Sequence, residues 1–121
     1  MGLSRDQIFA APGAAIESVA VPEWGEGASV SVRAFTLGAR NEFYAPLWSA
    51  DEADRVAASR DMDEARLLVF TLVDDAGKPL FTEADIPALR AMAPEPIDRI
   101  AAVARRLNGL GAKAAEDAAK N

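Results

Sequence analysis

The chain has 121 residues, with 13 lysines and arginines against 19 aspartates and glutamates, a net charge of −6, and neither cysteine nor histidine. The length fits a single domain. The missing residue types argue against disulfides, thiol or histidine catalysis and most zinc sites, and the acidic balance argues against nucleic-acid binding. Alanine supplies 27 of the 61 hydrophobic residues, so the larger apolar side chains suffice for one modest core.

Membrane association is not expected either. No apolar run approaches the length of about 18 residues that a transmembrane helix needs. Asp6 and Gln7 interrupt the apolar stretch that a signal peptide would require. We therefore expect a cytosolic protein without cofactor, metal or catalytic residues, whose work is to bind other proteins.

The first predicted element is a short helix over residues 4–10. Ser4 and Gln7 have the spacing of a capping box, and the Pro12-Gly13 pair ends the helix. This segment is either an arm that docks on a partner or an ordinary helix packed on the core of its own domain. We favour the second interpretation.

A β-hairpin is predicted over residues 16–35. Residues 16–21 and 29–35 alternate between apolar and polar side chains, as strands with one buried face do. The segment between them contains two glycines that suit a turn. A lone hairpin is marginally stable, so its apolar face has to rest on helices. Trp24 lies at the tip and either covers the core of the domain or is an exposed anchor for a partner; we favour the first.

Another helix is predicted after Thr36, which is a suitable N-cap. Phe43 and Leu47 lie four residues apart, which predicts a helix that Pro46 kinks or ends nearby. The aromatic cluster of this segment either lines a ligand pocket or packs in the core, and core packing is the favoured interpretation.

Two further capping patterns predict helix starts. Ser49 with Glu52 opens a helix over residues 51–59, and Asp61 with Glu64 opens the next. The apolar residues 67–73 either continue this second helix or form a buried strand, because short apolar runs do not separate the two. We favour the helix.

The segment 74–78 is predicted to be a turn, since it lacks the ligand pattern of a calcium loop and the glycines of a phosphate loop. A short helix is predicted to start near Thr82 and Asp85 and to run through Met92, before the prolines at 94 and 96.

The last predicted helix spans residues 95–108. Its apolar stripe consists of Ile97, Ile100, Ala101, Ala104 and Leu107. Arg105 and Arg106 either complement the helix dipole or form a basic binding spot, and we favour the first. Residues 111–121 have no large side chain with which to fold and are predicted to be a flexible, alanine-rich tail.

These elements together predict an α+β fold. The N-terminal hairpin, at about 16–35, packs on a bundle of about four to five short helices within 37–108. We expect one globular domain over residues 1–110. Helix formation already explains the acidic group Asp61, Asp63 and Glu64, so an enzyme is not predicted.

Several segments resemble a known family in their order and spacing. These segments are RDQIFAA, VPEWGEGASVSVRAF, TLGARNEF, ARLLVFTLVDDAGKPLFTEAD and IDRIAAVARRLNGL, followed by the acidic alanine-rich end. Together they resemble the tail assembly chaperones of long-tailed bacteriophages and prophages. The resemblance covers nearly the whole chain, and LVDDAGKPLF and ARRLNGL are its most specific parts.

The resemblance implies a non-catalytic assembly factor in the cytoplasm of the host bacterium. Such a protein binds the long, largely helical tape measure protein, keeps it soluble, helps tail tube subunits polymerise around it, and is absent from the mature virion. Family members are often encoded with a frameshift that appends a second domain, and the alanine-rich end fits either the shorter product or the point before such an extension. Self-association is left open. The alternative is a small structural tail or neck protein of the virion.

The last expectation concerns the surface that binds the client, the tape measure protein. Helix-in-groove recognition uses apolar anchors at helical spacing. We expect Trp24, Leu107 and Leu110 to form part of the partner-binding surface.

Overall fold

The predicted hairpin forms most of a small antiparallel sheet in the computed structural model, which describes residues 2–110. Strand β1 (Ile16–Ala20) pairs with β2 (Ser29–Arg33), and β2 pairs with the short β3 (Leu72–Val73). The α+β fold class is thus confirmed. The predicted tail over 111–121 lies outside the described residues.

The apolar segment 67–73 contains both of the structures considered for it. Helix α4 (Glu64–Thr71) includes its first residues, and β3 includes its last two. Leu72 pairs with Val32, and the amide of Leu80 then donates to the carbonyl of Leu72 at 3.1 Å. The helix prediction is therefore right as far as Thr71, and the next two residues, Leu72 and Val73, pair with β2 in the sheet.

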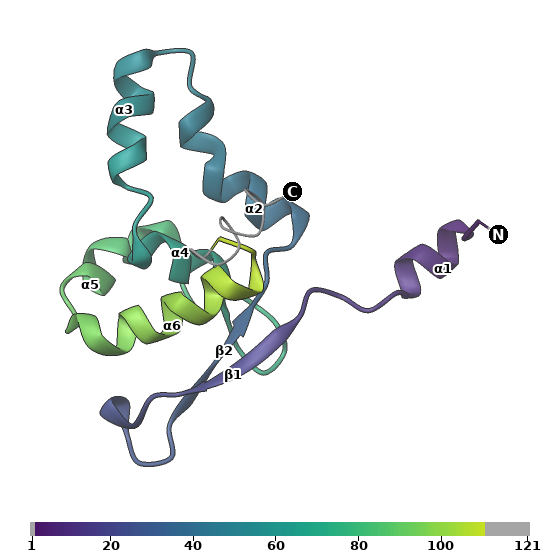
Figure 1. The fold of residues 1–121 in the computed structure, drawn as a ribbon, viewed down its shortest axis with the longest axis horizontal. Coiled ribbons are helices and arrows are strands. Elements are labelled where there is room, and N and C mark those ends of the chain that lie inside the picture. Colours follow the sequence, from purple (N-terminus) through teal and green to yellow (C-terminus); the bar gives the residue numbers. More distant parts are fainter. Residues whose placement is uncertain (1, 111–121) are drawn as a thin grey trace, which may run out of the picture.

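Of the remaining helices, α6 (Pro94–Leu107) packs across the sheet and the others extend beyond it (Figure 1). These others are α2 (Leu37–Tyr44), α3 (Glu52–Arg60) and α5 (Ile86–Arg90), with 3-10 turns η1 (Pro22–Trp24), η2 (Ala45–Trp48) and η3 (Glu83–Asp85). Helix α6 packs against α4 and against both hairpin strands. The hairpin thus rests on helices, as expected, whereas α2, η2 and α3 project away from the body (Figure 1).

The main core lies between the sheet, α4 and α6. Its buried residues are Val19, Val21, Val32, Phe43, Leu67, Leu68, Leu72, Ile97, Ile100, Ala101 and Ala104. The predicted stripe of α6 is confirmed, except that Leu107 is only partly buried. Of the predicted aromatic cluster, Phe43 packs in the core and Tyr44 partly against it, as favoured, whereas Trp48 is 65% exposed, so the core-packing prediction is wrong for Trp48.

Most predicted helix caps are present, and two are displaced by two residues. Ser4 and Thr36 accept from the expected amides. The cap of α3 is Asp51 and not Ser49, and the cap of α4 is Asp63 and not Asp61. At α3 a carboxylate directly before the first helical residue takes the place of a hydroxyl farther away, and at α4 the nearer of two aspartates accepts the free amide of the first turn.

Helix α1 (Arg5–Ala10) forms as predicted but does not pack on the core. None of its residues is buried, and the side chain of Phe9 is 74% exposed. Figure 1 shows the helix standing away from the body on an extended linker. The favoured interpretation, a helix packed on its own domain, is therefore wrong, because its apolar side chains Ile8 and Phe9, and Leu3 just before it, are exposed.

A buried arginine joins α4 to α2. Arg66, which is 5% exposed, donates from Nε and Nη2 to the carbonyl oxygen of Phe43 and from Nη2 to that of Glu42. Its guanidinium carbon lies 5.6 Å from the ring centre of Phe43 and 5.0 Å from that of Phe70. The charge is thus held by the carbonyls that end α2 and by two aromatic faces.

Replacing Arg66 with Met should lower the free energy of unfolding by about 3 kcal/mol, because buried carbonyl oxygens lose their donors. Urea denaturation at pH 7 measures the change. The control is Arg60→Met on the exposed side of α3, where we expect a change of less than about 0.5 kcal/mol. Equal stability of the two variants would contradict the role assigned to Arg66.

Candidate partner-binding surfaces

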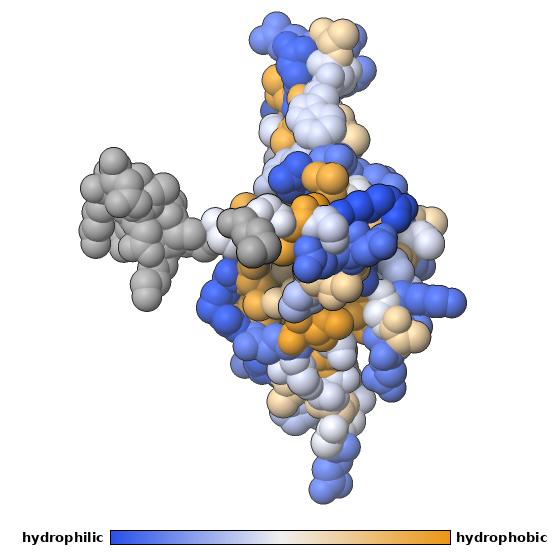
Figure 2. Space-filling model, turned by 90° about the vertical axis from the view of Figure 1, so that its right-hand side faces the viewer, coloured by the Kyte–Doolittle hydropathy of each residue, from blue (hydrophilic) through white to orange (hydrophobic). Residues whose placement is uncertain are grey.

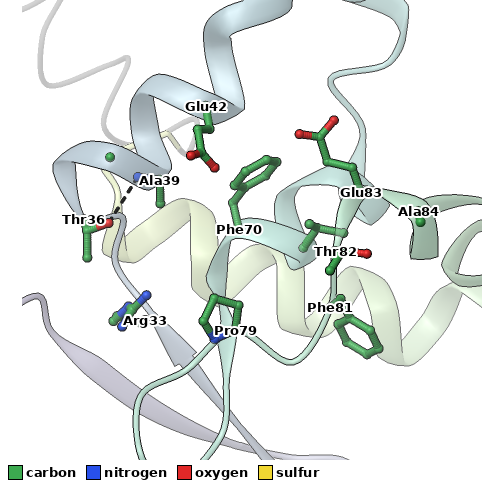
Figure 3. A pocket seen from close by; sticks show the side chains of 12 residues that line it. Arg33, Thr36, Ala39, Glu42, Phe70, Pro79, Phe81, Thr82, Glu83 and Ala84 are labelled. Carbon is green, nitrogen blue, oxygen red and sulfur yellow. Dashed lines mark hydrogen bonds between the residues drawn. The ribbon is translucent and has the colours of Figure 1, made fainter.

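The largest pocket is an open groove of about 650 Å³ between the start of α2, the end of α4 and residues 79–84 (Figure 3). We call it the central groove. It is defined by Arg33, Gly38, Glu42, Phe70, Phe81 and Glu83. Phe70 and Phe81 are half-buried. The groove therefore offers aromatic surface in a site that is open to solvent.

Opposite charges stand at the two ends of the central groove. Figure 3 shows Arg33 at one end and Glu42 and Glu83 on either side of Phe70 at the other. Arg33 Nη1 donates to the carbonyl oxygen of Gly77 at 2.6 Å. Within residues 2–110 no carboxylate lies within 4.0 Å of the Arg33 guanidinium, and its buried Nε has no hydrogen-bond partner. The positive charge is thus only partly compensated.

Trp24 lines a second pocket of about 320 Å³. The other lining residues are Leu72, Phe81, Asp85, Ala88, Leu89 and Met92. Trp24 is 39% exposed, so it covers the buried Leu72 with part of its ring and leaves the rest open. The buried part of the ring fits the core-lid interpretation, and the role of Trp24 as an anchor for a partner stays a prediction. Phe81 lines this pocket and the central groove alike.

An ion pair holds the hairpin tip in place beside this Trp24 pocket. Arg99 on α6 donates from Nη1 and Nη2 to the two carboxylate oxygens of Glu23, at 2.8 and 2.5 Å. These hydrogen bonds lower the pKa of Glu23 from 4.5 to about 2. Because Glu23 precedes Trp24 in η1, the pair also fixes where the indole ring can lie.

The other two predicted contact residues lie at the far end of α6. Leu107 packs partly against the core, and Leu110 is 41% exposed. Leu110 lines a third pocket of about 320 Å³, together with Phe35, Leu37 and Tyr44. Asn108 holds this end in place by accepting from the amide of Phe35 at 2.8 Å. The structure thus separates Leu107 and Leu110 from Trp24.

The three pockets nevertheless form a series in which neighbouring pockets share a lining residue. Phe81 belongs to the Trp24 pocket and the central groove, and Thr36 belongs to the central groove and the Leu110 pocket. We call this series the binding track. On the face drawn in Figure 2, hydrophobic residues gather near the middle of the body and hydrophilic residues surround them. Sequence reasoning named Trp24 and Leu110 as candidates and did not name the residues of the central groove.

The charged residues flagged in the sequence are engaged in ion pairs. Arg105 pairs with Glu64 at 2.7 Å, and Arg106 pairs with Glu17. The two arginines therefore bind carboxylates of their own chain, an interaction that neither sequence interpretation specified. Arg105 also lowers the pKa of Glu64.

Asp61 and Asp63 share a third arginine, Arg90, at 3.7 and 2.7 Å. Burial acts to raise the pKa of Asp63, but hydrogen bonds from Arg90 and from the Arg66 amide bring it below its ordinary value. In the described part of the chain, no cluster of three acidic residues is placed to hold a metal ion. No helix there has the length and apolar character for crossing a membrane.

The Glu23–Arg99 pair predicts a pH-dependent stability. Because the folded-state pKa of Glu23 lies below the unfolded value, the pair stabilises the fold above pH 4.5 and loses this effect as the pH falls toward about 2. The melting temperature of Glu23→Gln should therefore be below that of the wild type at pH 7, and the gap should close in acid. Glu26→Gln, in the same turn and outside any ion pair in residues 2–110, is the control. A gap that persists in acid would refute this assignment.

Comparisons with known proteins agree with this architecture. The solved structure of the bacteriophage HK97 tail assembly chaperone is similar in fold, with a TM-score of 0.54 and 22% sequence identity over 84% of this chain and 90% of that one. No curated protein sequence matches the chain closely. The family model described as phage tail assembly chaperone matches residues 4–121, nearly the whole length. The chain therefore belongs to the phage tail assembly chaperone family.

Proposed function

We propose that this chain binds the tape measure protein, keeps it soluble, and helps tail tube subunits polymerise around it, without catalysing a reaction. Membership of the phage tail assembly chaperone family supports this role. The observation that carries the proposal is the binding track, in which exposed apolar side chains lie in neighbouring pockets with charges beside them. Amphipathic helices are commonly recognised in such grooves.

The spacing of the pockets suits a long helical client. Met92 lines the Trp24 pocket just before α6, and Leu110 lines its own pocket just after α6. A helix of 14 residues, the length of α6, extends about 21 Å. A client helix that reaches both pockets is therefore at least about as long. We assign Trp24 and Leu110 to the contact surface and Leu107 to its support, since Leu107 packs on the core.

The net charge of −6 fits the same role. A chaperone that presents apolar pockets needs charge elsewhere on its surface to stay soluble. We place the protein in the cytoplasm of the host bacterium during tail assembly and outside the finished particle. It acts by covering apolar side chains of the client reversibly.

Co-expression with the tape measure protein of the same phage tests the client surface. We expect the wild-type chain to keep the tape measure protein in the soluble fraction, and Trp24→Ala combined with Leu110→Asp to reduce that fraction about tenfold, because both ends of the track lose apolar contacts. Gel quantification of soluble and pelleted protein measures this result.

Two controls make that experiment decisive. Val56→Asp changes an exposed apolar residue on α3, outside the binding track, and should leave solubility of the client unchanged. The melting temperature of each variant shows that it is folded. Leu107→Asp is less informative, because this side chain also supports the core. Full client solubility with the folded double variant would show that these residues are not the contact surface.

Mass spectrometry of purified virions tests the proposed location. We expect peptides of this chain in lysates of infected cells and none at stoichiometric amounts in the particle. Tail tube peptides from the same sample are the internal standard. A stoichiometric signal in the virion would instead favour a structural tail or neck protein.

A further inference from the structure

The central groove carries features that the fold itself does not explain. Gly38 lies in the first turn of α2, where a glycine lowers helix stability relative to alanine. Its φ is not positive, and a Cβ built on it would meet nothing within 4 Å. Neither backbone conformation nor packing within residues 2–110 requires a glycine here. Without a side chain at this position, a ligand can approach the backbone of α2 closely at one wall of the groove.

Incomplete charge pairing is a second, independent feature. Arg33 has no carboxylate within 4.0 Å among residues 2–110, and its buried Nε has no acceptor. At the other end Glu42 is exposed and has no cation partner in the same residues, while Glu83 reaches Arg66 at 3.4 Å. The partly buried Arg33, with its unsatisfied Nε, costs free energy, whereas the exposed Glu42 is solvated. A ligand with the opposite order of charges would recover it.

We infer that the central groove holds an amphipathic helix of the client with a defined orientation. Apolar side chains of that helix pack on Phe70 and Phe81. A lysine or arginine at one end of its apolar stripe lies against Glu42 and Glu83, and an aspartate or glutamate at the other end lies against Arg33. The backbone of the helix approaches closest at Gly38. This inference rests on the proposed function for the identity of the client as the tape measure protein.

The geometry favours a helix over other occupants. The groove has a volume of about 650 Å³ and is open along its length, so it takes a segment of chain and not a single enclosed side chain. It lies in the middle of the binding track, between the Trp24 and Leu110 pockets. A long helix that reaches either outer pocket therefore passes the charged ends of the central groove, and these charges select its direction.

The test uses Gly38→Phe, which places a ring in the groove at a position where the chain offers space. Its control is Asn41→Phe, which adds the same ring to the exposed part of α2 without lining any of the three pockets. Each variant of the full chain is co-expressed with the tape measure protein. We expect Gly38→Phe to lower the soluble tape measure fraction about tenfold, while its melting temperature stays at or above the wild-type value. Asn41→Phe should match the wild type.

A charge reversal tests the orientation and covers the case in which Gly38→Phe does not fold. Glu42→Lys should also lower the soluble client fraction, by about fivefold or more, whereas Glu52→Lys on α3 should not. Wild-type solubility with folded Gly38→Phe, or with Glu42→Lys, would overturn the inference and leave the proposed function standing. Failure of the wild-type chain itself to keep the client soluble would overturn both.

Discussion

The buried guanidinium of Arg66 is the constraint on which the helical layer depends. Its side chain comes from the first turn of α4, donates to the carbonyl oxygens of Glu42 and Phe43, and lies beside the rings of Phe43 and Phe70, which contact each other. A buried charge requires all of these partners, so α2 has one position relative to α4. That position places Glu42 and Phe70 across from each other and thereby sets the width of the central groove.

Helix α2 contributes both to the stability of the fold and to the central groove. Its carbonyl end is neutralised inside the protein by Arg66, whereas its first turn, with Gly38, faces the groove. The core is small and apolar, and Arg33 and Glu42, which line the central groove, have no ion-pair partner within residues 2–110. Natural proteins tend to break local rules of packing and pairing at functional sites. In this chain the departures at Gly38 and Arg33 line the same pocket.

Local patterns predicted most elements, and contacts between distant segments decided the rest. The two-residue period of the hairpin and the apolar stripe of α6 were sufficient to predict these elements, because each pattern reflects one buried face. Nothing local marks Arg66 as buried, since its partners lie 23 and 24 residues away. The groove escaped prediction for the same reason: Arg33 meets Gly77 across 44 residues. The exposure of α1 also could not be derived, because an amphipathic helix looks the same whether its partner is internal or external.

The projecting arm of α2, η2 and α3 has a consequence for the dynamics of the molecule. Ala58 is the only buried residue of α3, and η2 supplies most of the surface on which α3 packs. A segment with so little apolar burial opens at a small free-energy cost, while α4 and α6 remain closed. Amide hydrogens of α3 therefore exchange with solvent far ahead of those in the core. The chain thus combines a durable centre with an outer segment that can rearrange during assembly without unfolding the rest.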